Sequence, residues 1–275
     1  MIHERLQLKD YFEFLGKDSA NPMFDIYLPY DSLDRPDYKR PCLLICPGGG
    51  YAFCSPREAE PIALNFLPEG FNVFVLWYSV APYKFPTQIR EVAAAMELIN
   101  SKAEEWNCDT EKIAIMGFSA GGHLAGHYST KYDCSEVREF FPKSKAPNAS
   151  VLCYPVITAE KGKCHTGSFE NLVGHYPLTE AEMNCFSLER CVNNNTPPAF
   201  LWHTSCDTCV PVYNSLCYAN ALSEHNIPFE LHIFPQGQHG VATCDSQTLD
   251  DYKPCYDYDI VWFKEVSKWL KHINS

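Results

Sequence analysis

A serine in a glycine-flanked turn is the clearest chemical signal in this sequence. Ser119 lies in the segment GFSAG (117–121), which matches the pattern G-x-S-x-G. A strand-like run (112–117) comes before the turn and a helix-like run (122–129) follows it. In that setting the serine hydroxyl projects at the carboxyl edge of a sheet, and the helix points its N–H groups at developing negative charge. We therefore predict that Ser119 is a nucleophile.

An aspartate and a histidine stand where the partners of such a serine are expected. A serine hydroxyl needs a base, and the base needs an acid that orients it. In this type of fold the chain order is serine, acid, histidine. Asp207 follows the predicted strand 199–204, and His239 lies in a glycine-flanked loop after the predicted strand 229–235. We predict Asp207 as the orienting acid and His239 as the base.

Three consecutive glycines predict the site that stabilises the negative charge formed in such a reaction. The segment PGGGY (47–51) follows the first central strand, where a loop of this kind is expected. Backbone without side chains can turn two N–H groups towards one point. We assign Gly49 and Gly50 as donors, with the N–H of Ala120 as a third. Tyr51 directly follows these glycines and is our candidate for substrate contact.

Six short, almost entirely apolar runs predict strands that are buried on both faces, as in a parallel sheet. They are 41–47, 71–78, 112–117, 150–155, 199–204 and 229–235. Helical spacing is found from Pro86 to about Trp106, over 211–224, and at Ile260, Phe263, Val266, Leu270 and Ile273. A run at 23–29 predicts an antiparallel strand that leads in. This alternation predicts one α/β domain over 1–275, with helices on both faces of the sheet.

One segment interrupts the alternation of strands and helices. Residues 158–198 contain several glycines and prolines and no clear strand, although 178–186 and 187–192 suggest short helices. Because the segment follows the carboxyl end of a strand, we predict a lid-like insertion that forms a wall of the ligand site.

Composition and charge limit the classes of partner. The chain has 275 residues, of which 46% are hydrophobic, enough for a sizeable core. Its net charge of −12 disfavours nucleic acid and anionic membranes. No apolar run is long enough for a transmembrane helix, and the N-terminus does not resemble a signal peptide. We expect a cytoplasmic protein; the sequence leaves its oligomeric state open.

Fourteen cysteines are scattered through the chain, several of them in apolar runs. We expect mostly buried, reduced thiols. His203, Cys206 and Cys209 have the spacing of metal ligands, but a structural site needs a fourth ligand, so we predict no metal. We expect His203 to be packed or hydrogen-bonded within its strand. A disulfide between Cys206 and Cys209 would displace Asp207, so we expect reversible inactivation by strong oxidants.

Taken together, these motifs resemble a known family of enzymes. The segments are PGGGY, WYSVAPYKFP, GFSAGGHLA, YPVIT, TPPAFLWHTSCDTCVP and FPQGQHG. They resemble the α/β-hydrolase esterases related to hormone-sensitive lipase, and more closely the bacterial acetylxylan and bifunctional acetyl/feruloyl esterases. The resemblance runs from about Met23 to the C-terminus and implies the same triad and the same three N–H donors. Two positions depart from the family: Pro47 replaces a histidine that braces the glycine loop, and Cys206 replaces an acid.

The resemblance and the residues together predict a serine esterase that needs no cofactor. Ser119 would attack a short acyl ester, acetyl above all, on a xylo-oligosaccharide or related glycan, and water would hydrolyse the acyl-enzyme. Three alternatives stay open at this point. They are an oligopeptidase of the same fold, a hydrolase of xenobiotic esters or lactones, and a hydrolase-fold binding protein without catalysis.

Overall fold

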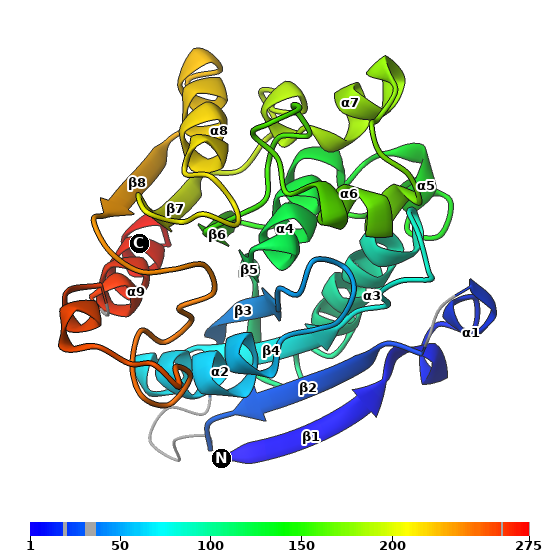
Figure 1. Cartoon of the computed structure of the whole chain (residues 1–275). Coiled ribbons are helices and arrows are strands. Elements are labelled where there is room, and N and C mark those ends of the chain that lie inside the picture. The colour runs from blue at the N-terminus through cyan, green and yellow to red at the C-terminus, as the bar shows by residue number, and fades with distance from the viewer. Residues whose placement is uncertain (19–20, 31–36, 260, 275) are drawn as a thin grey trace.

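The computed structural model describes residues 1–18, 21–30, 37–259 and 261–274. The strands form a single eight-stranded sheet in the order β1-β2-β4-β3-β5-β6-β7-β8. Their bounds are β1 Ile2–Gln7, β2 Met23–Leu28, β3 Arg40–Cys46, β4 Asn72–Trp77, β5 Cys108–Phe118, β6 Ala149–Cys153, β7 Ala199–Thr204 and β8 Phe229–Phe234. β3 to β8 run parallel, whereas β1 and β2 are antiparallel to their neighbours. The mostly parallel sheet and its antiparallel lead-in strand are thus confirmed (Figure 1).

Alternate side chains of the central strands supply two cores, one on each face of the sheet. On β3, Leu44 joins one core while Leu43 and Ile45 join the other, and all three are fully buried. This arrangement explains why the strand reads as a continuous apolar run, because neither face meets water.

Helices cover both faces of the sheet (Figure 1). Apolar side chains of α3, α4 and α8 pack into the first core, and those of α2 and α9 pack into the second. The helices are α1 Leu15–Asp18, α2 Glu60–Phe66, α3 Thr87–Ser101, α4 Ala120–Lys131, α5 Ser135–Arg138, α6 Thr166–Val173, α7 Glu180–Phe186, α8 Tyr213–Glu224 and α9 Trp262–Ile273. Short 3-10 helices are η1 Leu8–Asp10, η2 Pro56–Glu58, η3 Leu67–Glu69, η4 Leu188–Arg190 and η5 Pro254–Tyr258. None of the helices described is long and apolar enough to cross a bilayer.

The elements differ from the sequence prediction in a few places. β1 and the helices α1, α2, α5 and α6 were not predicted. β1 is an edge strand that is mostly exposed, so it lacks the apolar run that marks a buried strand. α3 ends at Ser101, earlier than the predicted end near Trp106, because the chain turns there before entering β5. Ile260, which we placed in the last helical pattern, lies outside the described residues.

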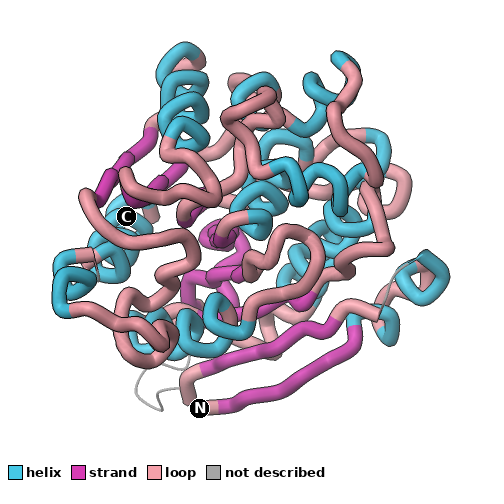
Figure 2. The backbone as a smooth tube through the Cα atoms, viewed as in Figure 1, coloured by secondary structure: helices cyan, strands magenta, loops and turns pink. Residues whose placement is uncertain are grey.

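The segment between β6 and β7 contains the predicted insertion. It consists of loop, α6, α7 and η4, and Figure 2 shows loop and short helices without a strand in this part of the chain. Thr179 caps the N-terminus of α7: its hydroxyl accepts the N–H of Glu182, while the Glu182 carboxylate accepts the N–H of Thr179. This reciprocal cap stabilises the start of a short helix.

Candidate active site

The chain enters and leaves Ser119 through a strained turn between β5 and α4. Ser119 has φ 52° and ψ −119°, a conformation that side-chain-bearing residues rarely adopt. The turn needs small neighbours: a Cβ on Gly117 would lie 2.0 Å from the carbonyl oxygen of Gly121, and one on Gly121 would lie 2.1 Å from that of Cys46. The Ser119 N–H donates to the carbonyl of Cys153 on β6, 3.0 Å away. The backbone thus fixes the position of the hydroxyl.

The structure brings the three predicted triad residues together. Nε2 of His239 lies 2.7 Å from Oγ of Ser119, and Nδ1 of His239 lies 2.6 Å from Oδ2 of Asp207. Because a carboxylate accepts, Nδ1 carries the proton that it donates to Asp207, and Nε2 is free to accept the serine proton. The residues come from loops after β5, β7 and β8, all at the carboxyl edge of the sheet.

Asp207 is held as a carboxylate by four donors. Its Oδ1 accepts the N–H groups of Cys209 and Val210, each at 2.9 Å, while its Oδ2 faces His239 and lies 3.3 Å from Nε2 of His203. Burial alone would raise the pKa of Asp207, but the hydrogen bonds from His203 and His239 outweigh it and hold that pKa well below its usual range. Asp207 therefore stays charged while it orients His239.

His203 is buried and hydrogen-bonded, as predicted from its place within a strand. Its Nε2 lies 2.9 Å from the carbonyl oxygen of Val210, and its Nδ1 lies 2.8 Å from Oγ of Ser215. A carbonyl only accepts, so Nε2 carries the proton and Nδ1 accepts the serine hydroxyl. The contact of His203 with Asp207 was not foreseen. Among the described residues, no cluster of three His, Cys, Asp or Glu side chains could hold a metal ion.

The glycine loop after β3 presents free N–H groups beside Ser119. Gly49 and Gly50 have φ 121° and 64°, and the Gly49 carbonyl accepts the N–H groups of Ala52 and Phe53, which closes the turn. A Cβ on Gly49 would lie 2.1 Å from the carbonyl oxygen of Phe53, so this position requires glycine. Within the described chain, the N–H groups of Gly49, Gly50 and Ala120 have no acceptor.

Tyr51 does not occupy the place predicted for it. Its side chain is 1% exposed, and its hydroxyl lies 2.9 Å from Nδ1 of His123 on α4. Nε2 of His123 donates to the carbonyl of Phe186, 2.8 Å away, so Nδ1 accepts the tyrosine proton. Tyr51 therefore links the glycine loop to α4. The expectation that its ring contacts substrate is corrected. The hydroxyl of Tyr78 also donates to the carbonyl of Pro47 at 2.7 Å, which adds a second link.

A cavity of about 330 Å³ opens above the serine. The insertion supplies part of its wall through His165, Gly167 and Asn171. The amide of Asn171 donates to the Gly50 carbonyl at 2.9 Å, which ties the insertion to the glycine loop. The other lining residues are Gly49, Gly50, Ala52, Phe53, Ser55, Arg57, Glu58, Ser119, Cys209, His239 and Gly240.

Several of these residues were not identified from the sequence. His165 and Asn171 lie in a segment with no motif of its own, and Arg57 and Glu58 lie in a short 3-10 helix after the glycine loop. The position of the insertion after a strand end was the only sequence signal for the first pair, and none marked the second.

Comparison with known proteins places the chain in a family. The family model BD-FAE matches residues 24–222. The chain is 40% identical to endo-1,4-beta-xylanase B of Butyrivibrio fibrisolvens over 225 residues, which cover 78% of this chain and 34% of that protein. It is 28% identical to the acetylxylan esterase of Xylanibacter ruminicola over 233 residues, which cover 83% of this chain and 45% of that protein. The chain therefore spans less than half the length of these two relatives.

A solved structure matches over nearly its whole length. The acetyl ester-xyloside bifunctional hydrolase of Caldicellulosiruptor lactoaceticus superposes with a TM-score of 0.82 at 36% sequence identity, covering 98% of this chain and 96% of that one. This match confirms the α/β-hydrolase fold that the motifs predict. From the family match and this structure together, the chain belongs to the BD-FAE family of α/β-hydrolases.

Proposed function

We propose that this protein is a serine carboxylesterase in which Ser119, His239 and Asp207 act as a triad. The hydrogen-bonded chain from Asp207 through His239 to Ser119, with contacts of 2.6 and 2.7 Å, carries the proposal. The imidazole is oriented with its free nitrogen towards the hydroxyl, which is the arrangement that general-base activation of a serine requires.

The reaction proceeds through an acyl-enzyme. Oγ of Ser119 forms a bond to the ester carbonyl carbon while its proton passes to Nε2 of His239. The tetrahedral intermediate then releases the alcohol, which takes that proton from the imidazolium. Water attacks the acyl-serine in the same way, giving up its proton to His239 and releasing the acid and free Ser119. Asp207 stabilises the imidazolium in both steps, because its carboxylate stays charged.

The N–H groups of Gly49, Gly50 and Ala120 stabilise the oxyanion in this mechanism. They have no acceptor within the described chain and lie beside Ser119, and the N-terminus of α4 adds its positive end. Donors fixed in advance need no rearrangement when charge develops on the oxygen.

The substrate that fits best is a short acyl ester, most simply an acetyl group on a xylo-oligosaccharide. The cavity is small, and the exposed ring of Phe53 at its rim offers an apolar face to a sugar. The names of the similar proteins, an acetylxylan esterase and an acetyl ester-xyloside hydrolase, support the same class. A cytoplasmic enzyme of this kind would act on imported oligosaccharides.

The direct test is acetate release from acetylated xylo-oligosaccharides, with 4-nitrophenyl acetate and peptide anilides alongside and Ser119→Ala as the control. We expect release from both acetyl esters, its loss in the variant, and no anilide cleavage. Cleavage of the aryl ester alone would rule out the glycan as the substrate, and anilide cleavage would favour an oligopeptidase. If neither ester is cleaved and a serine-reactive fluorophosphonate fails to label the protein, the catalytic proposal is wrong.

A further inference from the structure

A buried carboxylate lies between the glycine loop and the histidine loop. Glu58 ends η2 and is only 3% exposed. Its Oε2 accepts the N–H of Gly48 at 2.8 Å, and its Oε1 accepts the hydroxyl of Tyr154 at 2.7 Å. A Cβ on Gly48 would lie 2.6 Å from Oε2, so the close approach depends on glycine at that position.

Tyr154 continues this connection to the histidine. Its hydroxyl oxygen accepts the N–H of Ala242 at 3.1 Å, three residues after His239. Its ring contacts the ring of His239 edge to face, with centroids 5.2 Å apart at 72°. The N–H of Tyr154 donates to the Trp202 carbonyl at 2.7 Å, so the sheet holds its backbone.

We propose that Glu58 and Tyr154 are positioning residues that hold the oxyanion loop and the histidine loop in one fixed arrangement. The proposal rests on the function given above. Both hydrogen bonds of Glu58 reach groups that are themselves one step from the reacting atoms: Gly48 precedes the oxyanion donors, and Tyr154 packs on the base.

The chemistry of this pair suits a permanent brace. Burial, with the nearby charge of Glu58, holds the pKa of the Tyr154 phenol well above its usual value, so the phenol stays protonated and donates. The carboxylate accepts both of its hydrogen bonds, and charge-assisted hydrogen bonds of this kind are about twice as strong as neutral ones.

The consequence concerns the transition state more than substrate binding. Oxyanion donors that are displaced by a fraction of an ångström still admit the ester but stabilise the tetrahedral intermediate less. Loss of the brace should therefore lower kcat and leave KM nearly unchanged.

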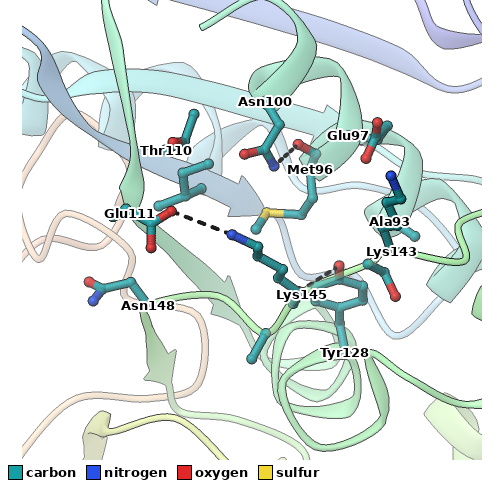
Figure 3. A pocket seen from close by; sticks show the side chains of 13 residues that line it. Ala93, Met96, Glu97, Asn100, Thr110, Glu111, Tyr128, Lys143, Lys145 and Asn148 are labelled. Atoms are coloured by element: carbon teal, nitrogen blue, oxygen red, sulfur yellow. Dashed lines mark hydrogen bonds and ion pairs between the residues drawn. The ribbon is translucent and has the colours of Figure 1, made fainter.

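The experiment compares Glu58→Gln, Tyr154→Phe and the double variant with Tyr128→Phe. Tyr128 is also buried, and its hydroxyl donates to the backbone carbonyl of Lys145 (Figure 3). Ser119 precedes the first residue of α4, whereas Tyr128 lies in the last turn of that helix. It therefore controls for the loss of a buried tyrosine hydroxyl. For each protein, kcat and KM for 4-nitrophenyl acetate and the midpoint of thermal unfolding are measured.

We expect kcat to fall roughly 10- to 100-fold in each brace variant, since loss of one oxyanion donor costs about 100- to 1,000-fold. KM should change less than about threefold. The kcat of the double variant should be no lower than that of the less active single variant, because both changes break the same connection. Tyr128→Phe should keep kcat within about twofold even if its unfolding midpoint drops.

Three results would contradict the proposal that Glu58 and Tyr154 position the two loops. They are full kcat in Tyr154→Phe, additive losses in the double variant, and losses that follow the unfolding midpoint in all four variants. These outcomes differ from a failure of the proposed function, which would appear as wild-type protein without esterase activity or as an active Ser119→Ala variant.

Discussion

Two cavities of similar volume lie at opposite ends of the central strand β5. The cavity at its carboxyl end, about 330 Å³, contains Ser119 and His239. The cavity at its amino end is larger, about 400 Å³, and is lined by side chains of α3, α4, β5 and the loop before β6, among them Glu97, Thr110 and Lys143 (Figure 3).

Three polar side chains of the amino-end cavity are directed at another lining residue or at the backbone. Nζ of Lys145 pairs with Glu111 at 3.4 Å, the amide of Asn100 donates to the Met96 carbonyl at 2.8 Å, and Tyr128 donates to the backbone of Lys145 (Figure 3). None of its lining residues has a positive φ. The geometry there is that of an ordinary surface depression between two helices.

The carboxyl-end cavity differs in its strained backbone and in the contact between its polar side chains. Gly49, Gly50 and Ser119 all have positive φ, and Oγ of Ser119 lies 2.7 Å from Nε2 of His239. A strained backbone beside hydrogen-bonded polar side chains marks a site better than volume or polarity does, because the strain costs folding free energy that packing alone would not require.

The largest difference between the two cavities is expected when one carboxylate in each is replaced by an amide and the activity is measured. Asp207→Asn should lower kcat about 10⁴-fold, because an amide stabilises the wrong imidazole tautomer and no longer neutralises the imidazolium. Glu111→Gln in the amino-end cavity should keep kcat within about twofold. Initial rates on 4-nitrophenyl acetate measure both. Equal losses in the two variants would mean that the cavities are not functionally distinct.

Oxidation should affect the carboxyl-end cavity next most strongly. Cys206 and Cys209 are exposed thiols on either side of Asp207, and the N–H of Cys209 donates to that carboxylate. A disulfide between them, formed as diamide takes up two electrons and two protons, should lower activity by roughly tenfold or more, since small displacements in a catalytic site are costly.

Dithiothreitol should restore this activity, and Cys206→Ser should resist the oxidant. Full activity of a protein in which mass spectrometry confirms the Cys206–Cys209 disulfide would contradict the expectation.

Two asparagines give a closer comparison. Asn171 and Asn100 each donate an amide hydrogen to a backbone carbonyl, that of Gly50 and that of Met96. Asn171→Ala should reduce kcat/KM by about three- to tenfold, because a net hydrogen bond of about 1 kcal/mol no longer holds the glycine loop. Asn100→Ala should leave it unchanged. A catalytic loss in Asn100→Ala, or none in Asn171→Ala, would remove the link between the insertion and the glycine loop.

The smallest effect is on stability. Asp207 has a folded-state pKa below its unfolded value of about 4, so it stabilises the fold above that pH and the contribution is lost as pH falls further. The free energy of unfolding of the wild type, measured in urea, should therefore decrease more steeply below about pH 4 than that of Asp207→Asn. Parallel pH profiles for wild type and Asp207→Asn would contradict this prediction.

The contact of Ser119, Asp207 and His239 could be predicted because each residue follows the end of a recognisable strand. The apolar runs before Ser119, Asp207 and His239 mark parallel strands, and parallel strands place their carboxyl ends at one edge. The same reasoning missed β1, because an exposed edge strand has no apolar run, and it overextended α3, because periodicity alone does not show where a chain turns.

The direction in which a side chain points could not be predicted from the sequence. Tyr51 directly follows Gly49 and Gly50, but its φ of 58° and the hydrogen bond to His123 turn its ring into the core. Glu58 and Tyr154 are 96 positions apart, and no local pattern shows that their side chains meet.

The sequence by itself determined most of the order of strands and helices, the three residues Ser119, His239 and Asp207 that the structure brings into contact, and the glycine loop. These depend on local periodicity and on backbone conformations that few residues adopt. Only the tertiary structure decided which side chains line the cavity, which way Tyr51 faces and how Glu58 joins two loops. Those contacts arise between segments that are distant in the chain, and their geometry is set by packing across the whole sheet.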